Sequence, residues 1–575
     1  MTPAGLFFPP GLVAIAGAVL VPLLPRRARS AAFLAVCLLA LALVFAIPDG
    51  ASRTVRVMDY SLVLLRMDAL SRVFGIVFAL IALAGGIYAF HLKDSGQQTA
   101  ALLYAGSGLG VVLAGDLLTL LVFWEVMALA STYLVWARRT EESEAAGTRY
   151  LLVHVFGGGL LFTGILVHLS QGGALEISAF APGTTALGPW LMLAGILLNA
   201  ACPPLHAWLP DAYPRATVTG AVFMSAFTTK AAVYLLLRVY PGWKILLVLG
   251  VMMTLYGVAY AILADDIRGI LSYHIVSQVG FMVAGAGIGS ELAVNGSAAH
   301  AYSHILYKAL LFMACGAVLE ATGRSKLSEL GGLAKAMPRT LALYMIAAFS
   351  ISGVPLFNGF VSKSMVLAAA HESHLTSAWA LMMLASAGTF FSVGLKLPYY
   401  AWFAKPHGAA PKPIPRNMEF GMGLVAILCV GYGVAPGLLY RFLPHAAGYE
   451  PFTAAHLVET GILLGLTFLA FWLVKGLLKP HEKSLFDLDW LYRKPAGVVR
   501  RVFVDGLGSL FDRSERRIQR IVRGAAAFGR NPAAALLREK PAPAYAPDRY
   551  RPLTQLLVLL VLSCFLVLAL LGLIW

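Results

Sequence analysis

Apolar stretches of about 20 residues, separated by short polar segments, follow one another along most of the chain. A helix of about 20 residues is long enough to cross a bilayer core of roughly 30 Å. On this rule the pattern predicts about sixteen membrane-spanning helices in an all-α polytopic membrane protein. The predicted spans lie near 5–24, 31–48, 68–90, 99–115, 116–137, 149–170, 188–206, 216–240, 243–264, 268–289, 299–321, 340–370, 376–403, 418–437, 455–478 and 552–574.

Helix-breaking residues interrupt two of these stretches. Segment 199–216, NAACPPLHAWLPDAYPRA, contains four prolines, and segment 351–360, ISGVPLFNGF, places glycine and proline among apolar residues. Non-helical backbone at membrane depth is tolerated only where it is buried in protein or lines a wet cavity. Broken helices in corresponding halves of a chain therefore point to a transport site, with an ordinary packing kink as the alternative for each.

Ionisable side chains also interrupt the apolar stretches. Glu125 lies in LLTLLVFWEVMALA, Lys230 in AVFMSAFTTKAAVYLLL and Lys363 in NGFVSKSMVLAAA. An ionisable group at membrane depth costs about 2.5–3.5 kcal/mol on insertion scales, and it typically marks an ion or proton path. Lys396 lies closer to the end of its stretch, so a snorkelling lysine is an equal alternative there.

A histidine–lysine stripe follows one predicted helix. His300, His304 and Lys308 are four residues apart, so they share one helix face and rise along it in steps of about 6 Å. Neutral imidazole both donates and accepts a hydrogen bond. The stripe therefore favours a proton relay bridged by water, although a single buried histidine is more often a hydrogen-bonded core residue.

Composition agrees with a membrane protein. The chain has 575 residues, of which 59% are hydrophobic and 13% charged, whereas soluble domains carry about 25% charged residues. The five cysteines are scattered and form no CxxC pair, and the sequence contains no nucleotide-binding motif, so neither a metal nor a cofactor is expected. Lysine and arginine accumulate in alternate loops, which places the N-terminus outside and the segment 479–551 in the cytoplasm.

Segment 479–551 differs in kind from the rest of the chain. It contains sixteen Lys and Arg against eight Asp and Glu, a net of +8, which is half of the chain's +16. Val504, Leu507, Leu510 and Phe511 recur at helical spacing with basic residues on the other face. This pattern predicts an amphipathic helix on the anionic inner leaflet or on a partner protein, and it gives no indication of nucleic-acid binding.

Six segments resemble the antiporter-like membrane subunits of respiratory complex I, Mrp-type multisubunit cation/proton antiporters and membrane-bound hydrogenases. They are VFWEVMALASTYLV, AACPPLHAWLPDAYPRA, TTKAAVYLLLR, DDIRGILSYHIVSQVGFM, HAYSHILYKALLFM and GVPLFNGFVSK. The resemblance covers about residues 60–440. It implies about fourteen core helices with two inverted five-helix repeats, each with a broken helix. About two further C-terminal spans and the surface helix follow this core.

The resemblance also implies roles for the buried charges. Glu125 is the paired glutamate, Lys230 the central lysine and Lys363 the terminal lysine, while the stripe on 300–308 is the connecting relay. One position departs from the family pattern. Members usually carry a lysine five residues before the second proline of the PPLHAWLPDA segment, and this chain has Asn199 there. Either Lys230 takes over as the partner of Glu125, or the first half-channel is weakened.

The predicted organisation has six parts. They are N-terminal helices (1–98), a first antiporter-like repeat (99–240), a second repeat (241–404), C-terminal helices (405–478), the basic amphipathic segment (479–551) and a final span (552–575). The tail resembles the extension of D-type and lateral-helix-bearing subunits.

These features predict that the chain is not an enzyme but translocates ions as part of a complex. The first hypothesis is the proton-translocating subunit of a multisubunit Na⁺ or K⁺/proton antiporter in the inner membrane of a bacterial-type cell. The alternative is a proton-pumping subunit of a complex I-like or hydrogenase-like redox complex. A third is a scaffold whose charges only orient partners. The expected partners are other membrane subunits, the lipid bilayer, protons and the exchanged cation.

Overall fold

The computed structural model describes residues 7–405 and 411–480, followed by 487, 488, 490, 495, 497, 498, 500–530, 554 and 556–563. The chain divides into two compact units, Met1–Leu488 and Asp489–Trp575. Most of the predicted final span, 552–574, lies outside the described residues.

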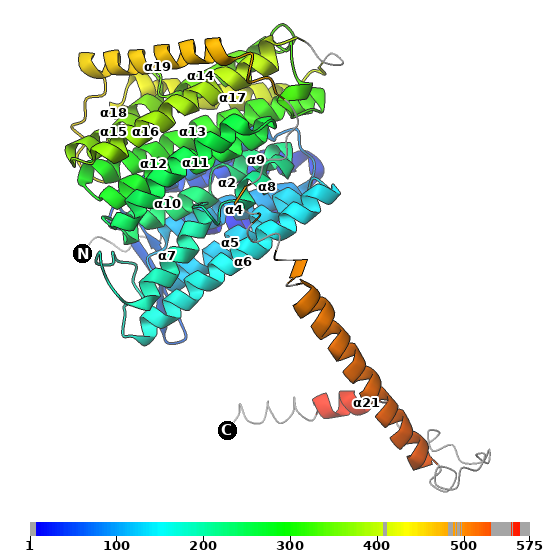
Figure 1. Ribbon diagram of the computed structural model, residues 1–575. Coiled ribbons are helices and arrows are strands. Elements are labelled where there is room, and N and C mark those ends of the chain that lie inside the picture. Colours follow the sequence, from blue (N-terminus) through cyan, green and yellow to red (C-terminus); the bar gives the residue numbers. More distant parts are fainter. Residues whose placement is uncertain are drawn as a thin grey trace. The chain divides into compact units, whose positions relative to one another are not determined.

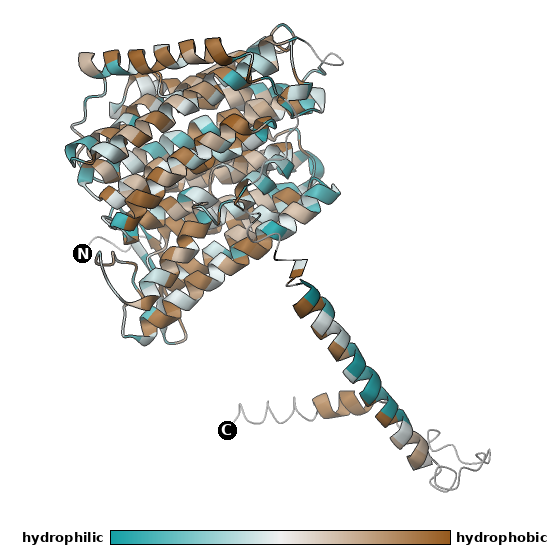
Figure 2. Ribbon diagram, viewed as in Figure 1, coloured by the Kyte–Doolittle hydropathy of each residue, from teal (hydrophilic) through white to brown (hydrophobic). Residues whose placement is uncertain are grey.

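Helices that run side by side make up the first unit (Figure 1). Eleven of the described helices are long and apolar enough to cross a membrane, which confirms the expected all-α polytopic fold (Figure 2). The helices are α1 (Pro10–Leu20), α2 (Arg26–Ala46), α3 (Ala69–Tyr88), α4 (Ser95–Leu113), α5 (Leu117–Trp136), α6 (Glu141–Ser170), α7 (Leu187–Asn199), α8 (Trp208–Ala212), α9 (Val218–Met224), α10 (Thr228–Val239), α11 (Lys244–Leu263), α12 (Ile267–Ile288), α13 (Glu291–Thr322), α14 (Pro338–Ser352), α15 (Asn358–Glu372), α16 (Thr376–Thr389), α17 (Arg416–Val434), α18 (Gly437–Tyr440) and α19 (Ala454–Val474).

Local sequence explains where many of these helices begin and end. Asp68, Asp116 and Asp266 precede α3, α5 and α12, and each carboxylate accepts a hydrogen bond from backbone N–H groups of the first turn. Gly289 and Gly323 end α12 and α13 with φ values of +73° and +70°, which glycine adopts without a steric penalty.

A β-hairpin, which the apolar pattern did not predict, lies between α2 and α3. Strands β1 (Ser52–Val57) and β2 (Tyr60–Arg66) pair antiparallel. The backbone N–H of Val63 donates to Asp116 Oδ2 at 2.6 Å, and Val63 accepts from Gly115. The hairpin is thereby tied to the start of α5.

Helices α4–α10 and α11–α16 share two features: each group contains a helix broken at a proline- or glycine-bearing segment, and each contains a β-bridge at a helix start. At the start of α5, Asp116 forms an isolated β-bridge with Glu176; at the start of α12, Asp266 forms one with Lys326. The first bridge lies at the end of the bundle where α10 ends and α11 begins. Phe180, four residues after Glu176, donates its backbone N–H to the carbonyl oxygen of Val239, the last residue of α10. The second bridge lies where α11 ends, so α5 and α12 begin at opposite ends of the bundle.

Three breaks interrupt the helices near the predicted site residues. Segment 200–207 separates α7 from α8, and 353–357 separates α14 from α15, at the two places where the sequence carries helix breakers. A third break, 225–227, separates α9 from α10 within a stretch that the apolar pattern treats as continuous. Helix α16 continues in π-helical turns at Phe390–Lys396 and Tyr399–Phe403.

The described part of the second unit contains the predicted amphipathic helix. A π-helical stretch, Arg500–Gly506, leads into α21 (Leu507–Arg530). Apolar residues such as Leu510, Ile518 and Ile521 gather on one side of α21 and basic residues on the other, as the brown and teal faces in Figure 2 show.

Candidate functional site

Glu125 lies near the middle of α5, and its carboxylate packs against a glycine stretch of α6. A Cβ at Gly158 would lie 1.8 Å from Glu125 Oε1, so a residue larger than glycine would have to displace the carboxylate. The Glu125 side chain is half-buried, and no basic side chain in the described ranges pairs with it. In this conformation, therefore, Lys230 is not its partner.

Asn199 is the last residue of α7 and approaches the same part of α6. A Cβ added to Gly157, the neighbour of Gly158, would lie 3.4 Å from Asn199 Oδ1. Both polar atoms of the buried Asn199 amide lack a hydrogen-bond partner among the residues that the structure describes. An unsatisfied buried amide costs about 1–3 kcal/mol. This position can hold a water but not a proton-carrying ammonium.

Lys230 lies in the first turn of α10, directly after the break at 225–227. Its side chain is fully buried. The ammonium Nζ donates to the carbonyl oxygen of Ser225, at the C-terminal end of α9, at 2.6 Å. Carbonyls at a helix end have no partner within their helix, and they carry the negative end of the helix dipole. The break therefore supplies the environment that holds a buried cation.

Lys363 and Lys396 bind helix ends in the same way. Lys363 Nζ donates to the carbonyl oxygen of Ile351 in the last turn of α14 at 2.7 Å, and to Ser386 Oγ at 3.3 Å. Lys396 Nζ donates to two carbonyl oxygens at the C-terminal end of α11, at 2.6 and 2.9 Å. Because Lys396 is 4% exposed and doubly bonded, the structure favours a buried site for it over snorkelling.

The histidine–lysine stripe occupies the middle of the long helix α13. His300, His304 and Lys308 are all fully buried. His300 Nδ1 lies 3.1 Å from Ser362 Oγ of α15, and its Nε2 lies 3.5 Å from the hydroxyl of Tyr307. By contrast, both ring nitrogens of His304 and the ammonium of Lys308 have no hydrogen-bond partner in the described part of the chain. Polar atoms of this kind require exchangeable partners such as water.

The charges of the lysines at the breaks are close enough to this stripe to interact with it. Lys230, Lys308 and Lys363 all interact electrostatically with the His304 ring. Lys230 also interacts electrostatically with Lys308. The structure thus brings five of the predicted residues together around α13. Glu125 lies apart from them, without a charge–charge contact to any member of the group in the described chain.

Comparison with known proteins supports the resemblance seen in the sequence. A family model described as NADH:quinone oxidoreductase/Mrp antiporter, transmembrane, matches residues 114–392. NADH-quinone oxidoreductase subunit N of Desulforudis audaxviator is 32% identical over 371 residues, which span 60% of this chain and 74% of that protein. The chain belongs to this family of antiporter-like membrane subunits.

Other similar proteins include both antiporter and respiratory proteins. The A/B subunit of a probable K(+)/H(+) antiporter from Rhizobium meliloti is 32% identical over 400 residues, covering 65% of this chain but only 40% of that protein. This chain therefore spans less than half the length of that relative. A chain of the membrane-bound sulfane sulfur reductase, an archaeal respiratory membrane complex, superposes with a TM-score of 0.71. It is 23% identical, and the match covers 98% of this chain and 99% of that one.

His274 is a candidate residue of this antiporter-like subunit that sequence reasoning missed. It lies on α12 and is fully buried, and neither ring nitrogen has a hydrogen-bond partner in the ranges that the structure describes. Its ring lies within electrostatic range of Lys308, Lys363 and Lys396. Its spacing of four from Gln278 places both side chains on one face of α12, a weak signal because Ser272, Tyr273 and Ser277 are polar residues of the same helix.

Asp487, after α19, contacts the antiporter-like core beside its first broken helix. Its Oδ1 lies 3.1 Å from His206 Nε2, and the hydroxyls of Tyr256 and Tyr273 donate to its carboxylate. Burial raises the pKa of Asp487, but the hydrogen bond and charge of His206 and the two hydroxyls outweigh burial and lower it to about 2. The carboxylate is therefore ionised at neutral pH.

Proposed function

We propose that this chain is the proton-translocating subunit of a multisubunit Na⁺ or K⁺/proton antiporter. Membership of the antiporter-like family and the 32% identity to part of a probable K(+)/H(+) antiporter support this class of function. One observation carries the proposal: His304 and Lys308 are fully buried, have no hydrogen-bond partner among the described residues, and lie within electrostatic reach of Lys230. Groups of this kind can change protonation state as neighbouring charges change.

The proposed path follows α13 across the second repeat. A proton held as the Lys230 ammonium passes through water to His304 or Lys308, and from there toward Lys363 by way of His300. Each imidazole accepts the proton at one nitrogen and releases one from the other. Because the lysines repel one another when charged, loading one favours release from the next.

Glu125 and Lys396 are the two proposed ends of the path. Glu125 is the end that faces partner subunits, and Lys396 is the end toward the predicted inside. Glu125 is half-exposed on α5, where a group from outside this chain can reach it. Lys396, reached through His274, lies at the predicted inside end of α11. Glu125 can thus exchange protons with a group outside this chain, and Lys396 can pass protons between the buried stripe and the predicted inside end of the bundle.

Vesicles containing the whole complex test the path. We expect Lys363→Ala and Glu125→Gln to reduce cation exchange driven by a pH gradient, whereas Lys244→Ala, which removes an exposed lysine at the start of α11, leaves it unchanged. Recovery of the other subunits with each variant checks assembly. Wild-type exchange in both site variants would contradict the proposed path.

A second candidate is the proton-pumping subunit of a redox complex. It is favoured by the match to NADH-quinone oxidoreductase subunit N, of which this chain covers 74%. The purified complex distinguishes the two. Antiport predicts that added Na⁺ or K⁺ dissipates an imposed pH gradient without any electron donor, and redox pumping predicts proton movement only when donor and acceptor are both supplied.

A further inference from the structure

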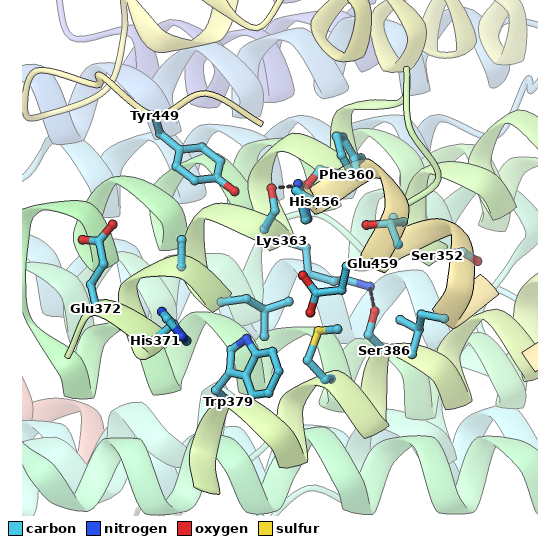
Figure 3. A pocket seen from close by; sticks show the side chains of 17 residues that line it. Ser352, Phe360, Lys363, His371, Glu372, Trp379, Ser386, Tyr449, His456 and Glu459 are labelled. Atoms are coloured by element: carbon cyan, nitrogen blue, oxygen red, sulfur yellow. Dashed lines mark hydrogen bonds between the residues drawn. The ribbon is translucent and has the colours of Figure 1, made fainter. Parts of the chain in front are cut away.

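A cavity of about 390 Å³ lies between α15, α16 and α19, beside Lys363 (Figure 3). One water molecule needs roughly 10–15 Å³ of such space, so the cavity has room for many. The Lys363 ammonium and its partner Ser386 both line it. Besides Lys363, the titratable side chains that face the cavity are His371 and Glu372 of α15, Tyr449 of the preceding loop, and His456 and Glu459 of α19.

The cavity lies toward one end of the bundle. The exposed rim residues Glu372 and His371 are at the C-terminal end of α15. Backbone contact of Gly296 with Val366 places this end of α15 beside the start of α13. The loops at this end are poor in lysine and arginine, so the distribution of charge predicts that the end faces outside.

Both ionisable residues of α19 face this cavity. His456, Glu459 and Thr460 are three and four residues apart and line the cavity together. Away from the cavity α19 is apolar, with Val458 61% and Ile462 57% exposed within this chain. A carboxylate that faces lipid is costly, so Glu459 requires water or a polar partner on its side of the helix. The cavity provides the space for that water.

We propose that this cavity is an aqueous vestibule that opens outside, and that Glu459 is the proton acceptor between Lys363 and the outer solution. The inference rests on the proposed function. The Lys363 ammonium loses a proton through water and becomes a neutral amine; the Glu459 carboxylate gains it and becomes a carboxylic acid. Glu459 then releases the proton to outside water. The ligand of this site is thus a proton, carried by water.

His456 holds α19 in place for this transfer. Its ring stacks on Phe360 of α15, with ring centres 4.7 Å apart. Its Nδ1 lies 2.8 Å from the carbonyl oxygen of Pro451, which makes Nδ1 the donor and leaves Nε2 as an acceptor in the neutral ring. We therefore assign His456 a positioning role and Glu459 the transfer.

The first experiment measures transport in vesicles containing the whole complex. We expect Glu459→Gln, which keeps the size of the side chain but binds no transferable proton, to slow exchange about 100-fold, at the lower end of the range for loss of a proton-transfer group. Glu459→Asp restores most of the rate. Glu450→Gln, which changes an exposed carboxylate in the loop before α19, leaves it unchanged.

The second experiment measures access to water. Thr460→Cys and Ile462→Cys lie two residues apart, one lining the vestibule and the other on the apolar face. A membrane-impermeant thiol reagent added outside should label Thr460→Cys at least several times faster than Ile462→Cys. Wild-type protein, with its native cysteines, gives the background. Equal labelling of the two variants would overturn the vestibule.

Exchange by the Lys363→Ala variant distinguishes a failure of the Glu459 assignment from a failure of the proposed proton-translocating function. If Lys363→Ala abolishes exchange but Glu459→Gln does not, Glu459 is not the acceptor and the proposed function stands. If Lys363→Ala exchanges like wild type, the proposed function itself fails.

Discussion

Different kinds of side chain satisfy the backbone carbonyls at the breaks 200–207 and 353–357. At the first of these breaks, a neutral group satisfies the end of α7: Trp208 Nε1 donates to the carbonyl oxygen of Leu198 at 3.0 Å, and the Asn199 side chain has no hydrogen-bond partner among the described residues. At the second, the ammonium of Lys363 donates to the carbonyl oxygen of Ile351 at the end of α14. Both solutions satisfy backbone at membrane depth, but only the second can lose a proton. A break in the backbone and a proton site are therefore separable features.

The largest expected effect comes from removing the charge at the second break while keeping a hydrogen-bond donor there. Lys363→Gln can still donate to the α14 carbonyl, so we expect the complex to assemble normally. Transport should fall about 100-fold, in the range typical of losing a proton-transfer group. Lys244→Gln is the matched control, measured by the same vesicle assay. Substantial exchange by assembled Lys363→Gln would show that the second break also serves only the backbone.

The converse change at the first break should affect stability and not transport. Trp208→Phe removes the indole donor and leaves the Leu198 carbonyl buried without that partner, which costs about 1–3 kcal/mol. We expect a lower thermal midpoint of the purified complex with exchange per assembled complex unchanged. Loss of exchange at wild-type stability would place a transport role at the first break.

The Asp487 contact predicts a smaller, pH-dependent effect next to the same break. Because its pKa is lowered to about 2, the contact stabilises the fold fully above the unfolded carboxyl value of about 3.9. That stabilisation is lost as pH falls through about 2. Asp487→Asn should therefore lower the thermal midpoint by a similar amount at pH 5 and pH 7, with the difference shrinking below about pH 4. A difference that grew on acidification would contradict the assignment.

The smallest expected effect is a gain. Asn199→Lys restores the side chain that the family usually has on the first broken helix, close to the glycine stretch that Glu125 contacts. We expect about a threefold faster exchange, equivalent to roughly 0.65 kcal/mol, because an opposite charge nearby favours ionised Glu125. The gain should disappear in the double variant with Glu125→Gln. A gain that persists without Glu125 would place its cause elsewhere.

The buried charges and the helices were readable from the sequence for one reason. A bilayer penalises both unsatisfied backbone and exposed charge, so apolar length marks the spans and an interrupting Lys230 or Lys363 marks an interior position. Two breaks were readable because proline and glycine mark them. The break at 225–227 has neither residue, and it follows from packing around Lys230.

Contacts between distant segments could not be predicted in this way. The carbonyl partners of Lys396 lie more than 130 residues away, and Asp487 meets Tyr256 across 231 residues. Periodicity gives the face of a helix but not its neighbour. His274 is hard to recognise because the charged run at 265–268, a few residues earlier, is typical of a solvated turn. In the structure, however, Arg268 is buried and donates to the Tyr213 carbonyl.

The position of Asp487 also decides how the C-terminal region can be dissected by deletion. A chain cut just after α19 would lose more than the amphipathic helix, since His206, Tyr256 and Tyr273 would lose a shared acceptor in the core. Such a truncation would produce a defect beside the first broken helix that imitates loss of a docking segment. A cut placed after Leu488 keeps the carboxylate, and only the difference between the two truncations reports on the helix itself.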